Sequence, residues 1–118
     1  MEKWLEDLVG VPYVEYGNTP EEGFHCAGLV RYVLNRVYKI NLATDPLLWR
    51  RMFMDVAWPG PLQEYDVPLF KDGIDSHIGV VIGTTDVLHS WEPAGGVILT
   101  RLERLAPSIE EVGRWKHR

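Results

Sequence analysis

The sequence predicts an α+β domain in which N-terminal helices pack on an antiparallel sheet. In the first third of the 118-residue chain, apolar residues recur at helical spacing. From residue 65 onward, the pattern changes to the period of two that is typical of strands. Helices followed by a run of strands favour the α+β class, and a chain of this length is expected to form one domain over residues 1–118.

Three helices are expected before the strands. The first is short and amphipathic, with Trp4, Leu5, Leu8 and Val9, and Gly10 can end it. The second covers residues 25–38, where the apolar residues 29, 30, 33, 34 and 37 fall on one face. A third, short helix is expected over residues 46–54, and the Pro-Gly-Pro segment at 59–61 breaks it.

Four strands are expected in the second half, at residues 65–70, 77–82, 86–91 and 97–102. A tight turn at residues 83–85 joins the second strand to the third. The tail at 109–115 fits either a helical turn or an edge strand, and the sequence does not separate the two.

Cys26 is the only cysteine, and it stands at the start of the strongest predicted helix. Unpaired backbone N–H groups and the positive end of the helix dipole favour a thiolate there. The simpler interpretation is that Cys26 is a small buried apolar residue. A nucleophilic cysteine needs a base, and the base needs an orienting group.

His77 and His89 are expected to share one face of the sheet. If residues 83–85 form the turn, His77 lies opposite Trp91 and His89 lies opposite Gly79. The two histidines are then diagonal neighbours roughly 7–8 Å apart at the backbone, and Gly79 offers no side chain to separate them. This predicts Cys26 as nucleophile, His77 as base and His89 as orienting group. Each histidine could instead be an ordinary sheet residue.

The remaining histidines and the tryptophans are weaker candidates. His25 adjoins Cys26, but neighbours along a helix do not face each other, so it is expected to be a poor base. His117 lies in the charged tail and is expected to be solvated. Most of the five tryptophans are expected in the core, and Trp91 is the best candidate for a substrate groove because it follows His89 closely.

Composition excludes several classes of protein. The net charge is −5 and no basic run occurs, so a nucleic-acid partner is not expected. No apolar stretch approaches the roughly 20 residues of a membrane span. Metal motifs such as CxxC and HExxH are absent, and no metal or cofactor is expected. The acidic N-terminus does not fit a signal peptide, so another route, such as a virion or cell lysis, is expected to bring the protein to its site of action.

Several motifs together resemble the NlpC/p60 family of cell-wall cysteine peptidases, which have a compact papain-like fold. GFHCAGLV at residues 23–30 resembles the family motif GFDCSGLV, and HIGVVIG at 77–83 resembles its His-Val-Gly-Ile strand. Three further segments, VPY at 11–13, YDVPLF at 65–70 and VLHS at 87–90, follow the family order. The resemblance runs from about residue 9 to about residue 102.

The resemblance implies the same three roles for Cys26, His77 and His89, and it places Tyr13 at the rim of the site near the oxyanion. It also implies hydrolysis of an amide bond in the peptidoglycan stem peptide, without a cofactor. Two positions depart from the motif, because His25 replaces Asp and Ala27 replaces Ser. The bare domain is similar to phage and prophage tail-associated members, so tail proteins are expected partners. The alternatives are a non-catalytic tail module that keeps the fold, and another papain-like amidase.

Overall fold

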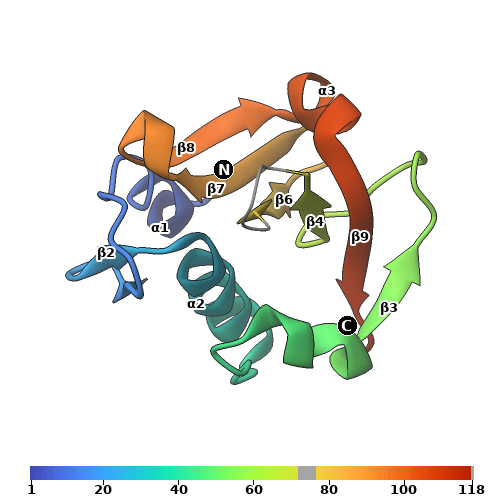
Figure 1. Cartoon of the computed structure of the whole chain (residues 1–118), viewed down its shortest axis with the longest axis horizontal. Coiled ribbons are helices and arrows are strands. Elements are labelled where there is room, and N and C mark those ends of the chain that lie inside the picture. The colour runs from blue at the N-terminus through green and yellow to red at the C-terminus, as the bar shows by residue number, and fades with distance from the viewer. Residues whose placement is uncertain (72–76, 118) are drawn as a thin grey trace.

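The structure, a computed structural model, describes residues 1–71 and 77–117. Short helices and one long helix precede most of the strands, as predicted (Figure 1). The elements in chain order are α1 (Lys3–Glu6), β1 (Asn18–Thr19), β2 (Gly23–Phe24), α2 (Cys26–Tyr38), η1 (Pro46–Met52), β3 (Phe53–Val56), β4 (Val67–Phe70), β5 (His77–Ile78), β6 (Val80–Ile82), β7 (Asp86–Trp91), η2 (Glu92–Ala94), β8 (Gly96–Arg101), α3 (Leu102–Leu105), η3 (Ala106–Ser108) and β9 (Ile109–Trp115).

Within the described residues, the strands form two main sheets and a small hairpin, and the ladders between them are antiparallel. One sheet has the order β3-β9-β4-β5, the other has the order β6-β7-β8, and β1 pairs with β2. The helix α2 packs against β5 and β7, so it touches both main sheets (Figure 1). The α+β prediction is confirmed.

The long helix α2 forms where the apolar periodicity predicts it. Leu29, Val30, Val33 and Leu34 are fully buried in the main core, and Val37 packs at its edge. The helix ends at Tyr38, and its C-cap, Lys39, adopts the left-handed conformation with φ of 60°. Cys26 is the first helical residue, so the predicted position of the thiol at a helix N-terminus is confirmed.

The first turn of α2 is held against the preceding loop by a close backbone contact. A Cβ atom at Gly28 would lie 2.0 Å from the carbonyl oxygen of Gly17, so only glycine fits there. The same Gly17 carbonyl accepts a hydrogen bond from the N–H of His25 at 3.0 Å. From the other side, the Ser90 hydroxyl on β7 donates to the Phe24 carbonyl at 2.7 Å. These contacts fix the backbone on either side of the thiol.

The structure corrects several predicted boundaries. The strand predicted at 77–82 is divided at Gly79 into β5 and β6, which belong to different sheets. The predicted strand 65–70 begins only at Val67, because Tyr65 has a φ of 70° in a turn. Leu102 belongs to α3 rather than to the strand predicted at 97–102. The helix predicted at 46–54 is the 3-10 helix η1, which ends at Met52 and leads directly into the unpredicted strand β3.

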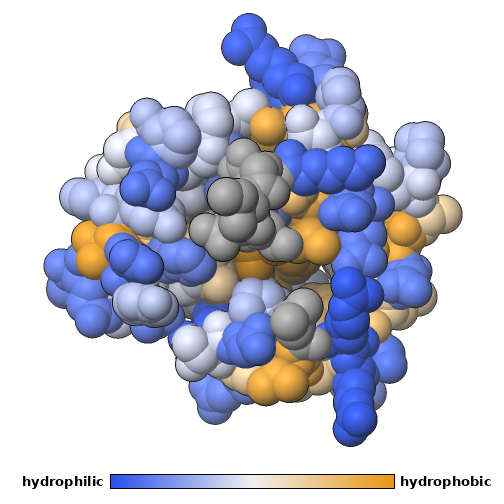
Figure 2. Space-filling view, viewed as in Figure 1, coloured by the Kyte–Doolittle hydropathy of each residue, from blue (hydrophilic) through white to orange (hydrophobic). Residues whose placement is uncertain are grey.

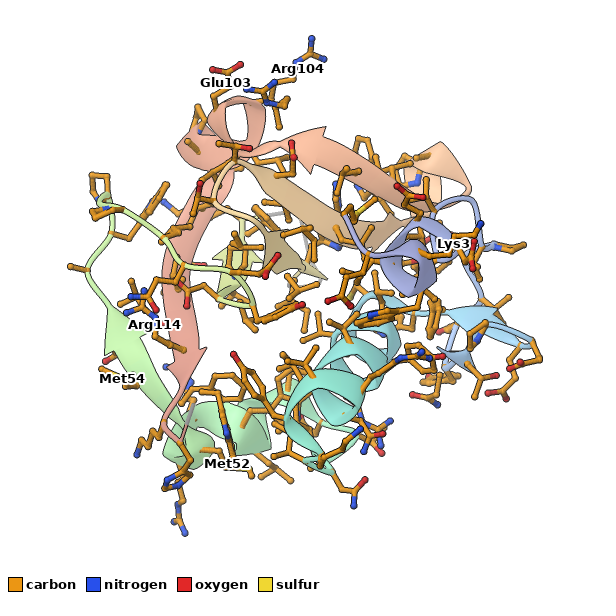
Figure 3. The ribbon with its side chains drawn as sticks, turned by 180° about the vertical axis from the view of Figure 1, so that it is seen from behind. Lys3, Met52, Met54, Glu103, Arg104 and Arg114 are labelled. Carbon is orange, nitrogen blue, oxygen red and sulfur yellow. The ribbon has the colours of Figure 1, made fainter. Side chains whose placement is uncertain are left out.

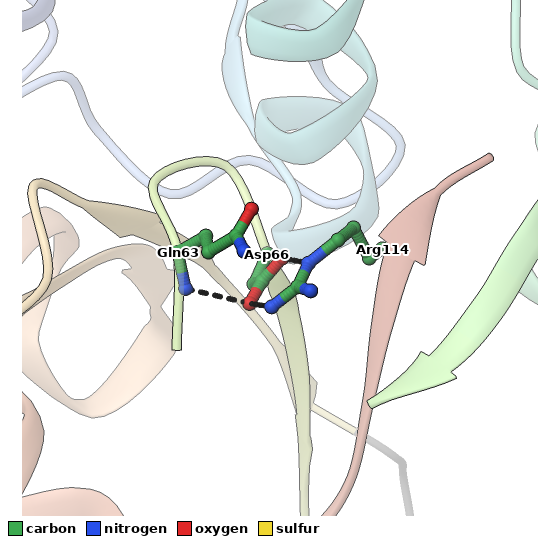
Figure 4. Close-up of polar contacts among 3 residues, drawn as sticks. All are labelled: Gln63, Asp66 and Arg114. Atoms are coloured by element: carbon green, nitrogen blue, oxygen red, sulfur yellow. Dashed lines mark hydrogen bonds and ion pairs between the residues drawn. The ribbon is translucent and has the colours of Figure 1, made fainter. Parts of the chain in front are cut away.

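The C-terminal tail is a strand but lies inside its sheet, between β3 and β4, so the edge position was wrong. An ion pair with a buried carboxylate joins this strand to the loop before β4, since Arg114 contacts Asp66 through two hydrogen bonds (Figure 4). Glu103 and Arg104 project outward from α3, away from the rest of the protein (Figure 3). Within the described ranges, no helix is both long and apolar enough to cross a membrane.

Candidate active site

The thiol of Cys26 is nearly buried, with the residue 6% exposed, at the N-terminus of α2. The helix has thirteen residues, and its N-cap, His25, has extended backbone angles but makes no side-chain capping bond. The first N–H groups of a helix have no partner within the helix, and they carry the positive end of its dipole. This environment favours a negative charge on the sulfur or on an oxygen beside it.

His77 and His89 meet as the turn length predicts. Between β6 and β7, Val80 pairs with Leu88 and Ile82 pairs with Asp86, which is the register that the turn predicts. His77 Nε2 lies 2.8 Å from His89 Nδ1, and both rings are buried. The predicted contact between the two imidazoles is therefore confirmed.

The backbone route to this contact differs from the expected one. His77 pairs with Phe70 on β4 rather than with Trp91, because the chain changes sheets at Gly79. A Cβ atom at Gly79 would lie 2.8 Å from a methyl carbon of Val87 and 3.1 Å from the Cβ of His89. The missing side chain at Gly79 thus lets β5 approach β7 closely enough for the rings to touch.

Three further side chains surround His89. Its second ring nitrogen, Nε2, lies 2.9 Å from the Thr100 hydroxyl on β8. Phe70 packs against both histidine rings, with centroids 5.5 Å from His77 and 6.2 Å from His89. Trp91 lies 6.2 Å from the His89 ring and is 37% exposed, so it reaches the surface beside the pair. Thr100 and Phe70 were not predicted as site residues, although strand register could have placed both.

His25 lies nearer to the thiol than predicted. Its Nδ1 and Nε2 atoms are 3.9 and 4.0 Å from Cys26 Sγ, because His25 precedes the helix instead of lying within it. The lone-pair directions of the two nitrogens diverge from each other across the ring. A sulfur equally distant from both nitrogens therefore lies along neither direction, and this geometry does not form a directed hydrogen bond. Tyr13, half-buried, packs against the His25 ring with a centroid distance of 5.8 Å.

A cavity of about 1010 Å³ opens beside the thiol and runs from the start of α2 to β9. Figure 2 shows a hollow on this face, with apolar residues deep inside it and hydrophilic residues along one side. Carboxylates dominate its polar wall: Glu15, Asp45, Asp55, Glu110 and Glu111. Arg50 is its one arginine or lysine among the described residues, and it pairs with Glu111 at 2.7 Å. The wall therefore disfavours anionic groups. It could not be predicted from the sequence, because its carboxylates come from four separate segments.

Burial makes the pH dependence of stability predictable at His89. Burial, and then the neighbouring His77, lower the pKa of His89 from its ordinary value of 6.5 to about 4. Between these values the unfolded chain binds a proton that the folded protein does not, so the free energy of unfolding falls as the pH drops. The contribution is roughly 3 kcal/mol, present in full above pH 6.5 and lost as the pH falls to about 4.

Urea unfolding at several pH values across this window tests the prediction. In the wild type, the unfolding free energy should decline from pH 6.5 to about pH 4, and in His89→Gln the decline should be shallower because the titrating group is gone. His117→Gln, at the exposed C-terminal end, is the matched control and should keep the wild-type slope. Equal slopes for wild type and His89→Gln would contradict the assigned pKa.

The described residues contain no group of three or more His, Cys, Asp or Glu side chains arranged to hold a metal ion. They also contain no buried side-chain nitrogen or oxygen atom without a hydrogen-bond partner. For chemistry, the site offers a thiol, an imidazole pair and a helix N-terminus.

Comparisons with known proteins address the family and the reaction class of similar proteins. A family model described as the NlpC/P60 family matches residues 10–108. The probable peptidoglycan endopeptidase LytE of Bacillus subtilis is 32% identical over 83 residues, which cover 70% of this chain and 24% of LytE. The probable endopeptidase YafL of Escherichia coli is 32% identical over 104 residues, covering 83% of this chain and 41% of YafL. A gamma-DL-glutamyl hydrolase of Bacillus subtilis is 40% identical over 82 residues, covering 66% of this chain and 19% of that protein.

Solved structures share the fold at low sequence identity. The NlpC/p60 domain of the peptidoglycan hydrolase SagA superposes with a TM-score of 0.76 at 19% identity, covering 93% of this chain and 92% of that one. A Bacillus cereus NlpC/P60 family protein gives a TM-score of 0.73 at 22% identity, covering 94% of this chain and 40% of that protein. The chain spans between about a fifth and two fifths of the length of the curated relatives above.

Proposed function

This chain belongs to the NlpC/P60 family, and on that premise we propose that it is a cysteine peptidase that hydrolyses an amide bond in peptidoglycan stem peptides. The observation that carries the proposal is the 2.8 Å contact between His77 and His89. It lies on the strands that pack against α2, the helix that begins at the only cysteine. Two relatives named as endopeptidases support the reaction class.

In the proposed reaction, Cys26 is the nucleophile and His77 is the base. His77 directs Nε2 toward His89, so Nδ1 is the nitrogen that takes the proton from the thiol. The thiolate attacks the carbonyl carbon of the substrate amide, and the oxyanion forms beside the backbone N–H of Cys26. One such donor contributes roughly 3 kcal/mol to stabilising the transition state.

Collapse of this intermediate breaks the carbon–nitrogen bond. The protonated His77 gives its proton to the leaving amine, and a thioester remains on Cys26. His77 then removes a proton from water, which attacks the thioester, and the carboxylic acid product leaves as the thiol is restored. His89 keeps the His77 ring in place throughout, and its lowered pKa keeps it uncharged at neutral pH.

The substrate is proposed to be a stem peptide cleaved next to its D-glutamate. The resemblance to NlpC/p60 peptidases implies the bond between D-glutamate and the following diamino acid, and one relative is named a gamma-DL-glutamyl hydrolase. The acidic wall of the cavity fits such a peptide, because a diamino acid carries an ammonium group that these carboxylates attract.

Mass-spectrometric mapping of products from purified peptidoglycan of several chemotypes tests this proposal, with Cys26→Ala as the inactive control. New amine and carboxyl ends within the stem peptide are expected with the wild type only. Cleavage between the glycan and the peptide would instead mark the enzyme as an amidase, which was the alternative from the sequence. If both proteins leave every chemotype intact, the proposed activity is wrong.

A non-catalytic module is the second candidate, and the departures at His25 and Ala27 favour it. Alkylation by iodoacetamide separates the two candidates without a substrate. An active site should give a thiol that reacts well below pH 8, whereas a structural cysteine should react as an ordinary buried thiol. Association with a phage or prophage tail stays a prediction, which co-purification with tail proteins from an induced lysogen would test.

A further inference from the structure

The far side of His89 carries a contact that the three proposed roles do not use. His89 Nε2 lies 2.9 Å from the hydroxyl oxygen of Thr100. Thr100 is on β8, where it pairs with Val87, so it is the diagonal neighbour of His89 across the ladder. His89 is 3% exposed, so a hydrogen on Nε2 has little access to water and depends on this acceptor.

The proton positions along the chain of rings are linked. A neutral imidazole has one N–H and one bare nitrogen. For His77 to accept the thiol proton on Nδ1, its own hydrogen must be on Nε2, where it donates to His89 Nδ1. His89 Nδ1 must then be bare, and the hydrogen of His89 must be on Nε2, facing Thr100.

The opposite arrangement has no base. If the hydrogen of His89 were on Nδ1, it would donate to His77 Nε2, and the hydrogen of His77 would be on Nδ1. His77 could then not take a proton from Cys26. The two arrangements use the same heavy-atom positions, so the choice between them depends on what faces His89 Nε2.

We infer that Thr100 is a positioning residue whose hydroxyl oxygen accepts a hydrogen bond from the N–H at His89 Nε2. This bond holds both histidines in one pair of tautomers, in which His77 Nδ1 can accept a proton. Thr100 acts through His89 and does not touch the substrate. This inference rests on the proposed function for its effect on turnover, but the tautomers themselves can be observed without a substrate.

Thr100→Val tests the inference, because valine keeps the branched shape and strand preference of threonine while removing the hydroxyl. Thr100→Ser keeps the hydroxyl. Thr84→Val, in the exposed turn 83–85, is the control for loss of a threonine hydroxyl elsewhere. For each variant, kcat and KM are measured on a stem peptide, and nitrogen-15 spectra of the imidazoles report which ring nitrogens carry hydrogen.

In Thr100→Val, kcat should fall about tenfold with KM within twofold, the size of effect expected when a buried N–H loses its acceptor. The spectra should show His89 Nδ1 gaining hydrogen. Thr100→Ser and Thr84→Val should stay within about twofold of wild type in kcat and keep the wild-type tautomers.

Unchanged imidazole spectra in Thr100→Val would overturn the inference. A higher kcat in Thr100→Val would also overturn it, because it would mean that the hydroxyl donates to His89 Nε2 and holds the opposite tautomers. If the wild type cuts no stem peptide, the proposed function fails separately, and the spectra still decide the role of Thr100. Thermal unfolding of each variant separates a tautomer change from loss of the fold.

Discussion

Replacing His77 by alanine is expected to lower kcat on a stem-peptide substrate by about a thousandfold or more, while KM changes only a few-fold. A positioned acid and base contributes 10²–10⁴-fold in enzymes of this kind. His77 would serve twice, first for the thiol and leaving amine and then for the attacking water, so the expected loss lies toward the upper end. Steady-state kinetics with a defined stem peptide measure it.

The same substitution should change the thiol itself. Without His77, the thiol loses its proposed proton acceptor, and rapid alkylation by iodoacetamide should require a higher pH than in the wild type. The helix N-terminus remains, so reactivity should not fall to that of a fully buried apolar cysteine. Alkylation rates against pH for wild type and His77→Ala give this comparison.

His25→Ala is the matched control, because both ring nitrogens of His25 lie within about 4 Å of the sulfur. It should keep most of the activity, since those nitrogens are not directed at the sulfur. A large loss in His25→Ala together with an active His77→Ala would mean that the base had been assigned to the wrong histidine.

Local patterns in the sequence predicted the parts of this site that depend on local structure. The apolar spacing of residues 29 to 34 fixes α2, and with it the place of Cys26 at the helix start. The turn at 83–85 fixes the register of β6 on β7, because a hairpin register follows from the length of its loop. That register led to the prediction that the two imidazoles meet, and they do, although His77 lies in the other sheet and not on the same sheet face as His89.

Contacts between distant segments were not predictable in the same way. At Gly79 the chain changes sheets, because residues 77–78 pair with β4 while residues 80–82 pair with β7. The local sequence does not show which of these two strands a residue will pair with. The interior position of β9 depends on its pairing with β3. This strand directly follows a 3-10 helix, and its four residues do not alternate between apolar and polar side chains. The acidic cavity wall gathers carboxylates from separate segments, including β3 and β9, so it was not predicted either.

The second large effect concerns stability. Arg114→Met is expected to lower the free energy of unfolding by about 3–5 kcal/mol, because it leaves a buried carboxylate without its cation. Asp66 is fully buried, and Arg114 contacts its two oxygens at 2.7 and 2.8 Å (Figure 4). The backbone N–H of Gln63 also donates to Asp66, at 2.8 Å. The pair therefore ties β9 to the loop that leads into β4.

Urea unfolding of Arg114→Met measures this loss, and in a protein of this size the melting temperature should fall by on the order of 10 °C or more. Arg114→Lys keeps the charge but cannot make both hydrogen bonds, so its loss should be intermediate. The double variant Asp66→Asn with Arg114→Met should recover part of the stability, because the uncompensated charge is then gone.

Arg50 provides the matched control for these variants. Its ion pair with Glu111 has the same length, 2.7 Å, but both side chains are largely exposed, at 65% and 42%. Arg50→Met should therefore cost only about 0–1 kcal/mol. Both pairs join an arginine to a carboxylate at the same shortest distance, and the Asp66 pair differs in its burial and in its second hydrogen bond. Equal losses in Arg50→Met and Arg114→Met would mean that side-chain packing, and not the stranded carboxylate of Asp66, determines the cost.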